Sequence, residues 1–127
     1  MAHGSARIGR DKYRTEIEVG GHRLISDEKA TLGGADAGPG PYDLILAGLG
    51  ACTAITLRMY ADRKQWPLDS VEVRLKTVRD GENLRIERTL VVAGLDDAQK
   101  ARLADIAERT PVTLTLKSGV PIRTSLG

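Results

Sequence analysis

The sequence contains few of the residues that many functional sites require. Its 127 residues include one cysteine, one tryptophan, three tyrosines and no phenylalanine. A single cysteine excludes an internal disulfide and a cysteine zinc site, and so few aromatic side chains argue against a base-stacking platform. The 19 basic and 17 acidic residues leave a net charge of +2. We therefore expect no nucleic acid partner.

The amino-terminal MAHGSARIGRD lacks the apolar core of a secretory signal. Together with the free cysteine, this favours a cytoplasmic location. The length fits one domain over residues 1–127, with residues 1–10 expected as a disordered tail. The sequence predicts neither a metal site nor a cofactor.

The least polar stretch runs from Pro41 to Trp66 and contains the cysteine, Cys52. No charged residue lies between Leu44 and Leu57. A membrane span needs about 20 apolar residues, so this uncharged run is too short and no membrane partner is expected.

A long helix is predicted over this stretch. Pro41 suits the first helical position, and Asp43 lies where a carboxylate meets the positive end of the helix dipole. The helix should end near Lys64, before Pro67, after about 36 Å at about 1.5 Å per residue.

A helix that is apolar on all sides must be buried on all sides. This one is rich in small residues, and each mid-helix glycine costs about 1 kcal/mol relative to alanine. Close approach of another backbone would offset that cost. We expect a second helix to pack here, its own copy in a homodimer; an ordinary core helix under a sheet is the alternative. The small residues are Ala47, Gly48, Gly50, Ala51 and Ala54.

Alternating apolar and charged residues predict two hairpins. The first covers Tyr13–Ser26 with its turn at Gly20-Gly21, and the second covers Val71–Val92 with its turn at Asp80-Gly81. In the second, Arg88 interrupts the apolar pattern, and we expect Arg85, Glu87 and Arg88 on a solvated face.

The remaining segments complete an α+β order of β-β-α-β-β-α-β with a largely antiparallel sheet. Asp96 and Gln99 have the spacing of a capping box and predict a helix of about 14 residues. Residues 111–118 could form a helical turn or a strand, and Val120–Leu126 alternates as a last strand. The glycine- and proline-rich residues 27–41 predict a loop, either a plain connector or a lid over Cys52.

Cys52 is the one side chain with intrinsic nucleophilic reactivity. Its apolar neighbours disfavour a thiolate, and it lies too far from the helix start for the dipole to help. A reactive thiolate would need a cation from another element, for which Arg14 and Arg23 are candidates. Without one, an inert buried cysteine is the simpler interpretation. Asp43 lies half a turn out of phase with Cys52, whereas Tyr42 is nearer the sulfur's side.

The stretch GPGPYDLILAGLGACTAITLRMYADRKQWPLDSVEV resembles the central region of the OsmC/Ohr family, the osmotically inducible and organic hydroperoxide resistance proteins. RLISDEKATLGGAD and RTPVTLTLKSGVPIRTSL resemble the flanking regions. The resemblance implies an intertwined homodimer with two long helices at its centre, sheets from both chains around them, and one interface site at each Cys52.

The resemblance also implies reduction of organic hydroperoxides. In the family one cysteine attacks the peroxide, a second resolves the sulfenic acid, and an Arg and a Glu hold the first thiolate. Here the second cysteine is replaced by Thr110, the Glu by Tyr42 followed by Asp43, and the nearest Arg is Arg23. A hydroxyl cannot close a disulfide, so the two-cysteine cycle is excluded.

Two hypotheses remain open. In the first, Cys52 reduces an apolar organic hydroperoxide, Arg23 and Asp43 support the thiolate, and an external small thiol or dithiol restores it. In the second, the homodimer binds another small molecule or is structural, and Cys52 is a packing residue. The predicted substrate contacts are Tyr42, Gly48, Leu49, Thr56 and Thr110.

Overall fold

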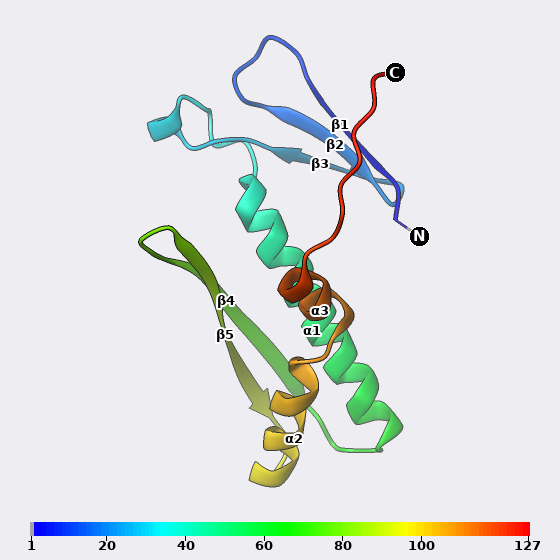
Figure 1. Ribbon diagram of the computed structural model, residues 1–127. Helices are drawn as coiled ribbons and strands as arrows, with labels where there is room; N and C mark the ends of the chain where they lie inside the picture. Colours follow the sequence, from blue (N-terminus) through cyan, green and yellow to red (C-terminus); the bar gives the residue numbers. More distant parts are fainter. Residues whose placement is uncertain (1) are drawn as a thin grey trace. The chain divides into compact units, whose positions relative to one another are not determined.

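The computed structural model describes residues 2–127, which form two compact units, one ending at Ile45 and one from Leu46 to Gly127. The amino-terminal unit holds a three-stranded antiparallel sheet. The carboxy-terminal unit holds a two-stranded antiparallel sheet and two short helices, and the long helix α1 begins in the first unit and continues in the second (Figure 1). The predicted α+β class is confirmed.

The amino-terminal sheet has the strand order β1-β2-β3, with β1 at Gly4–Ile8, β2 at Thr15–Val19 and β3 at His22–Ser26. The predicted first hairpin is therefore β2–β3, and its turn residues, Gly20 and Gly21, both have positive φ, which glycine adopts without steric cost. Strand β1 corrects the expectation of a disordered tail, because residues 4–8 pair along β2.

The loop from Asp27 to Gly40 is held by hydrogen bonds around one buried carboxylate. Asp27 accepts bonds from the backbone N–H groups of Tyr13, Glu28, Ala35 and Ala37 at 2.7–3.2 Å. The Ser26 hydroxyl and the Asp27 amide both donate to the Pro39 carbonyl. The loop also contains a single 3-10 turn, Ala30–Leu32. These contacts describe a pinned connector and not a free lid.

Helix α1 spans Pro41–Arg63, one residue short of the predicted end. The Asp43 carboxylate accepts a bond from the Gly40 amide at 2.9 Å, so it satisfies one of the free N–H groups at the helix start. Its buried residues are spaced one turn apart and lie on one side: Leu49, Thr53, Leu57 and Ala61. Burial on all sides, expected from composition, is therefore absent within residues 2–127.

The carboxy-terminal unit encloses its core between α1, the hairpin of β4 (Ser70–Asp80) and β5 (Asn83–Ala93), and α2 (Asp97–Ala107). The predicted capping box is present at Asp96 and Gln99, which explains where α2 begins. The buried centre consists of apolar side chains from all of these elements and the loop before β4: Leu57, Ala61, Leu68 and Leu103, with Val71, Leu90 and Val92 packed against them.

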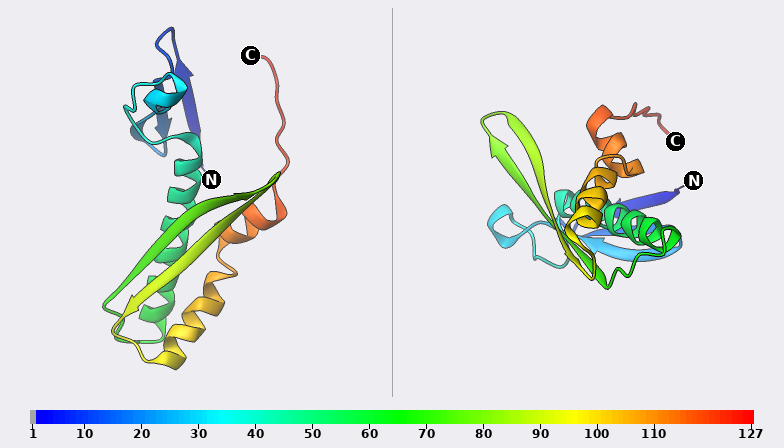
Figure 2. Two further views of the ribbon diagram at one scale, coloured as in Figure 1. Left: turned by 90° about the vertical axis from the view of Figure 1, so that its left-hand side faces the viewer. Right: turned by 90° about the horizontal axis from the view of Figure 1, so that it is seen from below.

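Residues 111–118, ambiguous in the sequence, form helix α3, Pro111–Ser118, with Pro111 at its first turn. The predicted last strand is wrong for the isolated chain. Residues 119–127 are extended but pair with no strand among residues 2–127, as Figure 2 shows, and Ile122 and Leu126 are 87% and 101% exposed.

We predict that Asp27→Asn loosens the loop, because an amide cannot accept four hydrogen bonds as a carboxylate does. Hydrogen exchange at the Ala35 and Ala37 amides should be at least about tenfold faster in the variant. Asp36→Asn is the matched control, because Asp36 is exposed in the same loop and its positive φ also suits asparagine. Equal exchange in the two variants would contradict the prediction.

The same loop should be acid-labile. Burial raises the pKa of the Asp27 carboxyl, but the four amide bonds lower that pKa below its ordinary value of 3.8. The pKa of Asp27 is lower in the folded protein than in the unfolded chain. The contribution of this carboxylate to the stability of the folded state is therefore present above pH 3.8 and is lost as the pH falls through the pKa of the folded state.

Candidate functional site

Cys52 lies half-buried on the side of α1 that this chain leaves open. Gly48, Cys52, Ile55 and Met59 follow one another at intervals of four, three and four residues, the spacing of a helix–helix seam. Ile55 and Met59 are each 55% exposed, and a Cβ added at Gly48 would meet no atom within 4 Å. The cysteine therefore lies on an apolar stripe, which we call the open stripe, defined by these four residues.

The two central glycines of α1 differ in what lies over them. A Cβ at Gly50 would lie 2.9 Å from Leu75 Cδ1 of β4, so the hairpin packs against the helix there. No such neighbour exists for Gly48 among residues 2–127. Packing within the chain thus accounts for Gly50 and leaves the small residue beside Cys52 without a partner.

The side of α1 away from the open stripe is joined to the rest of the unit by Arg88. Its Nη1 donates to Thr53 Oγ1 at 3.0 Å and to Thr113 Oγ1 at 2.9 Å, and its Nη2 donates to the Ala107 carbonyl at 2.8 Å. The expectation that Arg88 lies on a solvated face is wrong. Only Arg85 and Glu87 do so, as an exposed ion pair at 3.1 Å.

Three buried threonine hydroxyls complete this network. Thr110 and Thr113 share a hydrogen bond at 2.6 Å, and Thr53 also donates to the Leu49 carbonyl at 2.7 Å. All three side chains are at most 4% exposed. Hydrogen bonds that involve a charged group contribute about 1.5–3 kcal/mol each, so the guanidinium is a strong tie between β5, α1, the end of α2 and α3.

The charge on Arg88 is not paired with a carboxylate within 4 Å among residues 2–127. Glu108, which follows Ala107, pairs instead with Lys117 at 2.7 Å. The Lys117 bond and charge lower the pKa of Glu108, and the Arg88 charge adds a smaller effect in the same direction. The network around Thr53 therefore carries a net positive charge.

Two of the predicted substrate contacts of the carboxy-terminal unit, Leu49 and Thr110, are buried in this chain. Thr110 is 1% exposed and occupied by Thr113, and the Leu49 side chain is 5% exposed. Thr56 is half-buried, as Cys52 is, and lies one helical turn after it. Of the predicted site residues in this unit, Gly48 and Cys52 belong to the open stripe as defined above.

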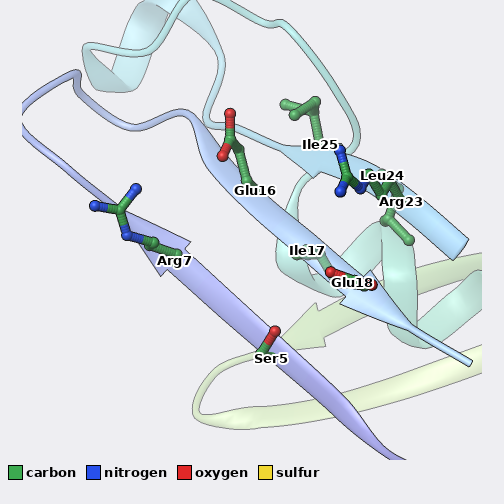
Figure 3. A pocket seen from close by; sticks show the side chains of 8 residues that line it. All are labelled: Ser5, Arg7, Glu16, Ile17, Glu18, Arg23, Leu24 and Ile25. Carbon is green, nitrogen blue, oxygen red and sulfur yellow. The ribbon is translucent and has the colours of Figure 1, made fainter. Parts of the chain in front are cut away.

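Arg23 lies on the polar face of the amino-terminal sheet. It stands opposite Glu18 in the pairing of β2 with β3, as Arg7 stands opposite Glu16 in the pairing of β1 with β2. Figure 3 shows these side chains around a shallow hollow of about 320 Å³. The other candidate cation, Arg14, forms an exposed ion pair with Glu16 at 3.5 Å.

Tyr42 and Asp43 also belong to the amino-terminal unit. Tyr42 is 57% exposed, and with Asp43 it lines a second hollow of about 340 Å³ beside the pinned loop. The observed bond of Asp43 is the helix-start bond to Gly40. Across residues 2–127, no group of three or more His, Cys, Asp or Glu side chains could hold a metal ion.

A family model described as OsmC-like protein matches residues 33–125, a range that includes all of α1, both strands of the second hairpin, α2 and α3. The chain belongs to the OsmC-like protein family. The match covers the predicted contacts from Tyr42 to Thr110 and excludes Arg23. None of the curated proteins searched matches the chain.

Solved structures show the same fold. The organic hydroperoxide resistance protein OhrB of Bacillus subtilis is 26% identical with a TM-score of 0.62, covering 91% of this chain and 90% of that one. An organic hydroperoxide resistance protein OsmC from Legionella pneumophila is 21% identical with a TM-score of 0.66, covering 92% and 89%. An OsmC-like protein from Mycoplasma pneumoniae is 17% identical with a TM-score of 0.73, covering 92% and 87%.

The sequence analysis did not identify Arg88, Thr53 and Thr113 as a group. One signal was present, since Arg88 occupies an apolar position in the alternation of its strand. The register now explains this: Arg88 faces Leu75 across the hairpin, on the side that also carries Leu90 and Val92. A charged residue on this apolar side of the hairpin requires hydrogen-bond partners from the elements that pack against it.

We predict that Thr113→Val lowers the free energy of unfolding by about 1–3 kcal/mol, because valine removes the acceptor of one Arg88 N–H and the hydroxyl that is bonded to Thr110. Thr115→Val on the exposed side of the same helix is the matched control. Urea unfolding of both variants checks this, and an equal loss in the two would show that the network contributes nothing specific.

Proposed function

We propose that the protein is a homodimeric one-cysteine peroxidase that reduces organic hydroperoxides with an external thiol. The observation that carries the proposal is the place of its single cysteine, half-buried on the open apolar stripe of α1 in a chain of the OsmC-like family. The names of two solved relatives, from Bacillus subtilis and Legionella pneumophila, give the substrate class.

The proposed reaction has two steps. The Cys52 thiolate attacks the distal peroxide oxygen, the O–O bond breaks, and the leaving alkoxide takes a proton to become an alcohol while Cys52 becomes a sulfenic acid. One external thiol then displaces water to form a mixed disulfide. A second thiol, or the second group of a dithiol, releases the Cys52 thiol and the oxidised reductant.

The replacement at Thr110 supports an external reductant. Its hydroxyl is bonded to Thr113 within the Arg88 network and has no redox chemistry. Because residues 1–127 contain no other cysteine, the sulfenic acid has no resolving partner within the chain.

Two unpartnered surfaces support the homodimer. By length and composition α1 is apolar enough to cross a membrane, with a mean hydropathy of 1.5, yet only 22% of that window is buried within the chain. A helix at the centre of a soluble dimer has the same properties, and a helix on the open stripe would occupy the space above Gly48. The extended residues 119–127 offer a strand to a partner's sheet.

In this proposal Arg23 supports the thiolate, Asp43 or Tyr42 orients that arginine, and the alkyl group of the substrate lies against the open stripe. The cytoplasm is the proposed location, where small thiols are abundant. For this role the Arg23 guanidinium must be reachable by the Cys52 sulfur. Arg23 is exposed and lines the hollow on the polar face of the sheet, so its guanidinium is accessible.

A second candidate is a dimer that binds a small molecule without peroxidase chemistry. The observation that favours it is Thr110, because the position implied for the second cysteine is filled by a buried hydroxyl that serves the packing of α3. In that case Cys52 would be a contact of the bound ligand.

We predict that the purified protein consumes cumene hydroperoxide in the presence of dithiothreitol and that Cys52→Ser abolishes turnover, since serine cannot form a sulfenic acid. Peroxide loss and mass spectrometry of oxidised Cys52 are the measurements. Thr115→Ser, on the exposed side of α3 and outside the predicted site, is the control. Equal consumption by wild type and Cys52→Ser would exclude the peroxidase and favour the second candidate.

We predict that Gly48→Leu converts the dimer to a folded monomer. Within the chain a Cβ at residue 48 meets no atom within 4 Å, so we expect the larger side chain to clash with the partner helix and not with its own chain. Light scattering after size exclusion gives the mass, and circular dichroism checks folding. Ala101→Leu on the exposed side of α2 is the control; a Gly48→Leu protein that stays dimeric places the interface elsewhere.

A further inference from the structure

Arg88 reaches the turn of α1 that carries Cys52. It bonds to Thr53, the residue after the cysteine, while Leu75, its cross-strand neighbour, packs on Gly50, two residues before it. The hairpin therefore contacts α1 on both sides of Cys52 in the sequence. Successive helical residues point about 100° apart, so these contacts lie on the side of α1 away from the sulfur.

The same guanidinium holds the connection between α2 and α3. It bonds to the Ala107 carbonyl at the end of α2 and to Thr113 in the first turn of α3. Thr113 in turn bonds to Thr110, which precedes α3. One side chain thus fixes the relative position of the Cys52 turn and the start of α3.

The positive charge of Arg88 is not neutralised locally. Its acceptors are two hydroxyls and one carbonyl, all neutral, and Glu108 is paired with Lys117. Arg88 is partly buried, so its guanidinium has lost part of its hydration, and three neutral hydrogen-bond acceptors replace that part without a partner charge. A negative charge that forms nearby during function would provide one.

We propose that Arg88 is a positioning residue for Cys52: it fixes the Cys52 turn of α1 against the start of α3 and places an unneutralised positive charge behind the cysteine. This inference rests on the proposed function, in which Cys52 reacts as a thiolate that a nearby positive charge supports. It acts through Thr53 and touches no substrate.

The test uses alkylation of Cys52 by iodoacetamide, which requires a thiolate but no peroxidase activity. The dimeric wild type, Arg88→Met and Arg88→Lys are compared from pH 6 to 10, with thermal unfolding measured in parallel. We expect Arg88→Met to react about tenfold more slowly at pH 7 and to approach the wild-type rate at high pH. Arg88→Lys, which keeps the charge, should recover part of the difference.

Two further variants separate positioning from folding. Val92→Ala removes packing on the same face of the hairpin and should lower the melting temperature without changing the alkylation profile. Thr53→Val removes the bond between Arg88 and α1, together with the Thr53 bond to the Leu49 carbonyl, and keeps Arg88 itself. It should shift the profile in the same direction as Arg88→Met, which keeps the test available if Arg88→Met does not fold.

The proposal is overturned if Arg88→Met remains folded with the wild-type profile, or if its rate rises toward that of the denatured protein, which would mean that Arg88 only packs. Failure of the peroxidase assay with an altered alkylation profile would reject the proposed function and leave the role of Arg88 standing.

Discussion

The structure depends on a helix that its own chain covers on one side only. The β4–β5 hairpin and α2 bury the side of α1 marked by Leu49, Thr53, Leu57 and Ala61, and they leave the open stripe unburied. Removing apolar surface from water is the dominant favourable term in folding, at roughly 25 cal/mol per Å². An exposed stripe on the longest helix therefore favours association, and the cysteine lies within it.

Much of this fold could be predicted from local chemistry. Pro41 and the capping box at Asp96 and Gln99 mark helix starts, and the glycine turns mark both hairpins, because each requires a specific backbone geometry or donor. The last strand could not be placed, since Val120–Leu126 alternates correctly but a strand also needs a neighbour, and none lies within residues 2–127. Strand β1 was missed because GSARI is short and mostly polar.

The candidate site was predicted only in part. Cys52 was chosen as the candidate nucleophile because one thiol among 127 residues is chemically distinct, and its role stays a prediction. Arg88 was assigned to solvent because charge alone says nothing about direction. The direction follows from the register, which pairs Arg88 with Leu75 13 positions earlier, and from the bond to Thr53 35 positions earlier. Thr110 was predicted as a substrate contact from its place in the family pattern, whereas its hydroxyl is occupied by a hydrogen bond that only the folded α3 creates.

The bond between Thr110 and Thr113 has a consequence for how the protein responds to its surroundings. A disulfide at this position would make the attachment of α3 depend on the reduction potential of the compartment. Two hydroxyls bonded at 2.6 Å involve no electron transfer. The packing of α3 therefore does not depend on a thiol–disulfide equilibrium and should be the same in reducing and oxidising conditions.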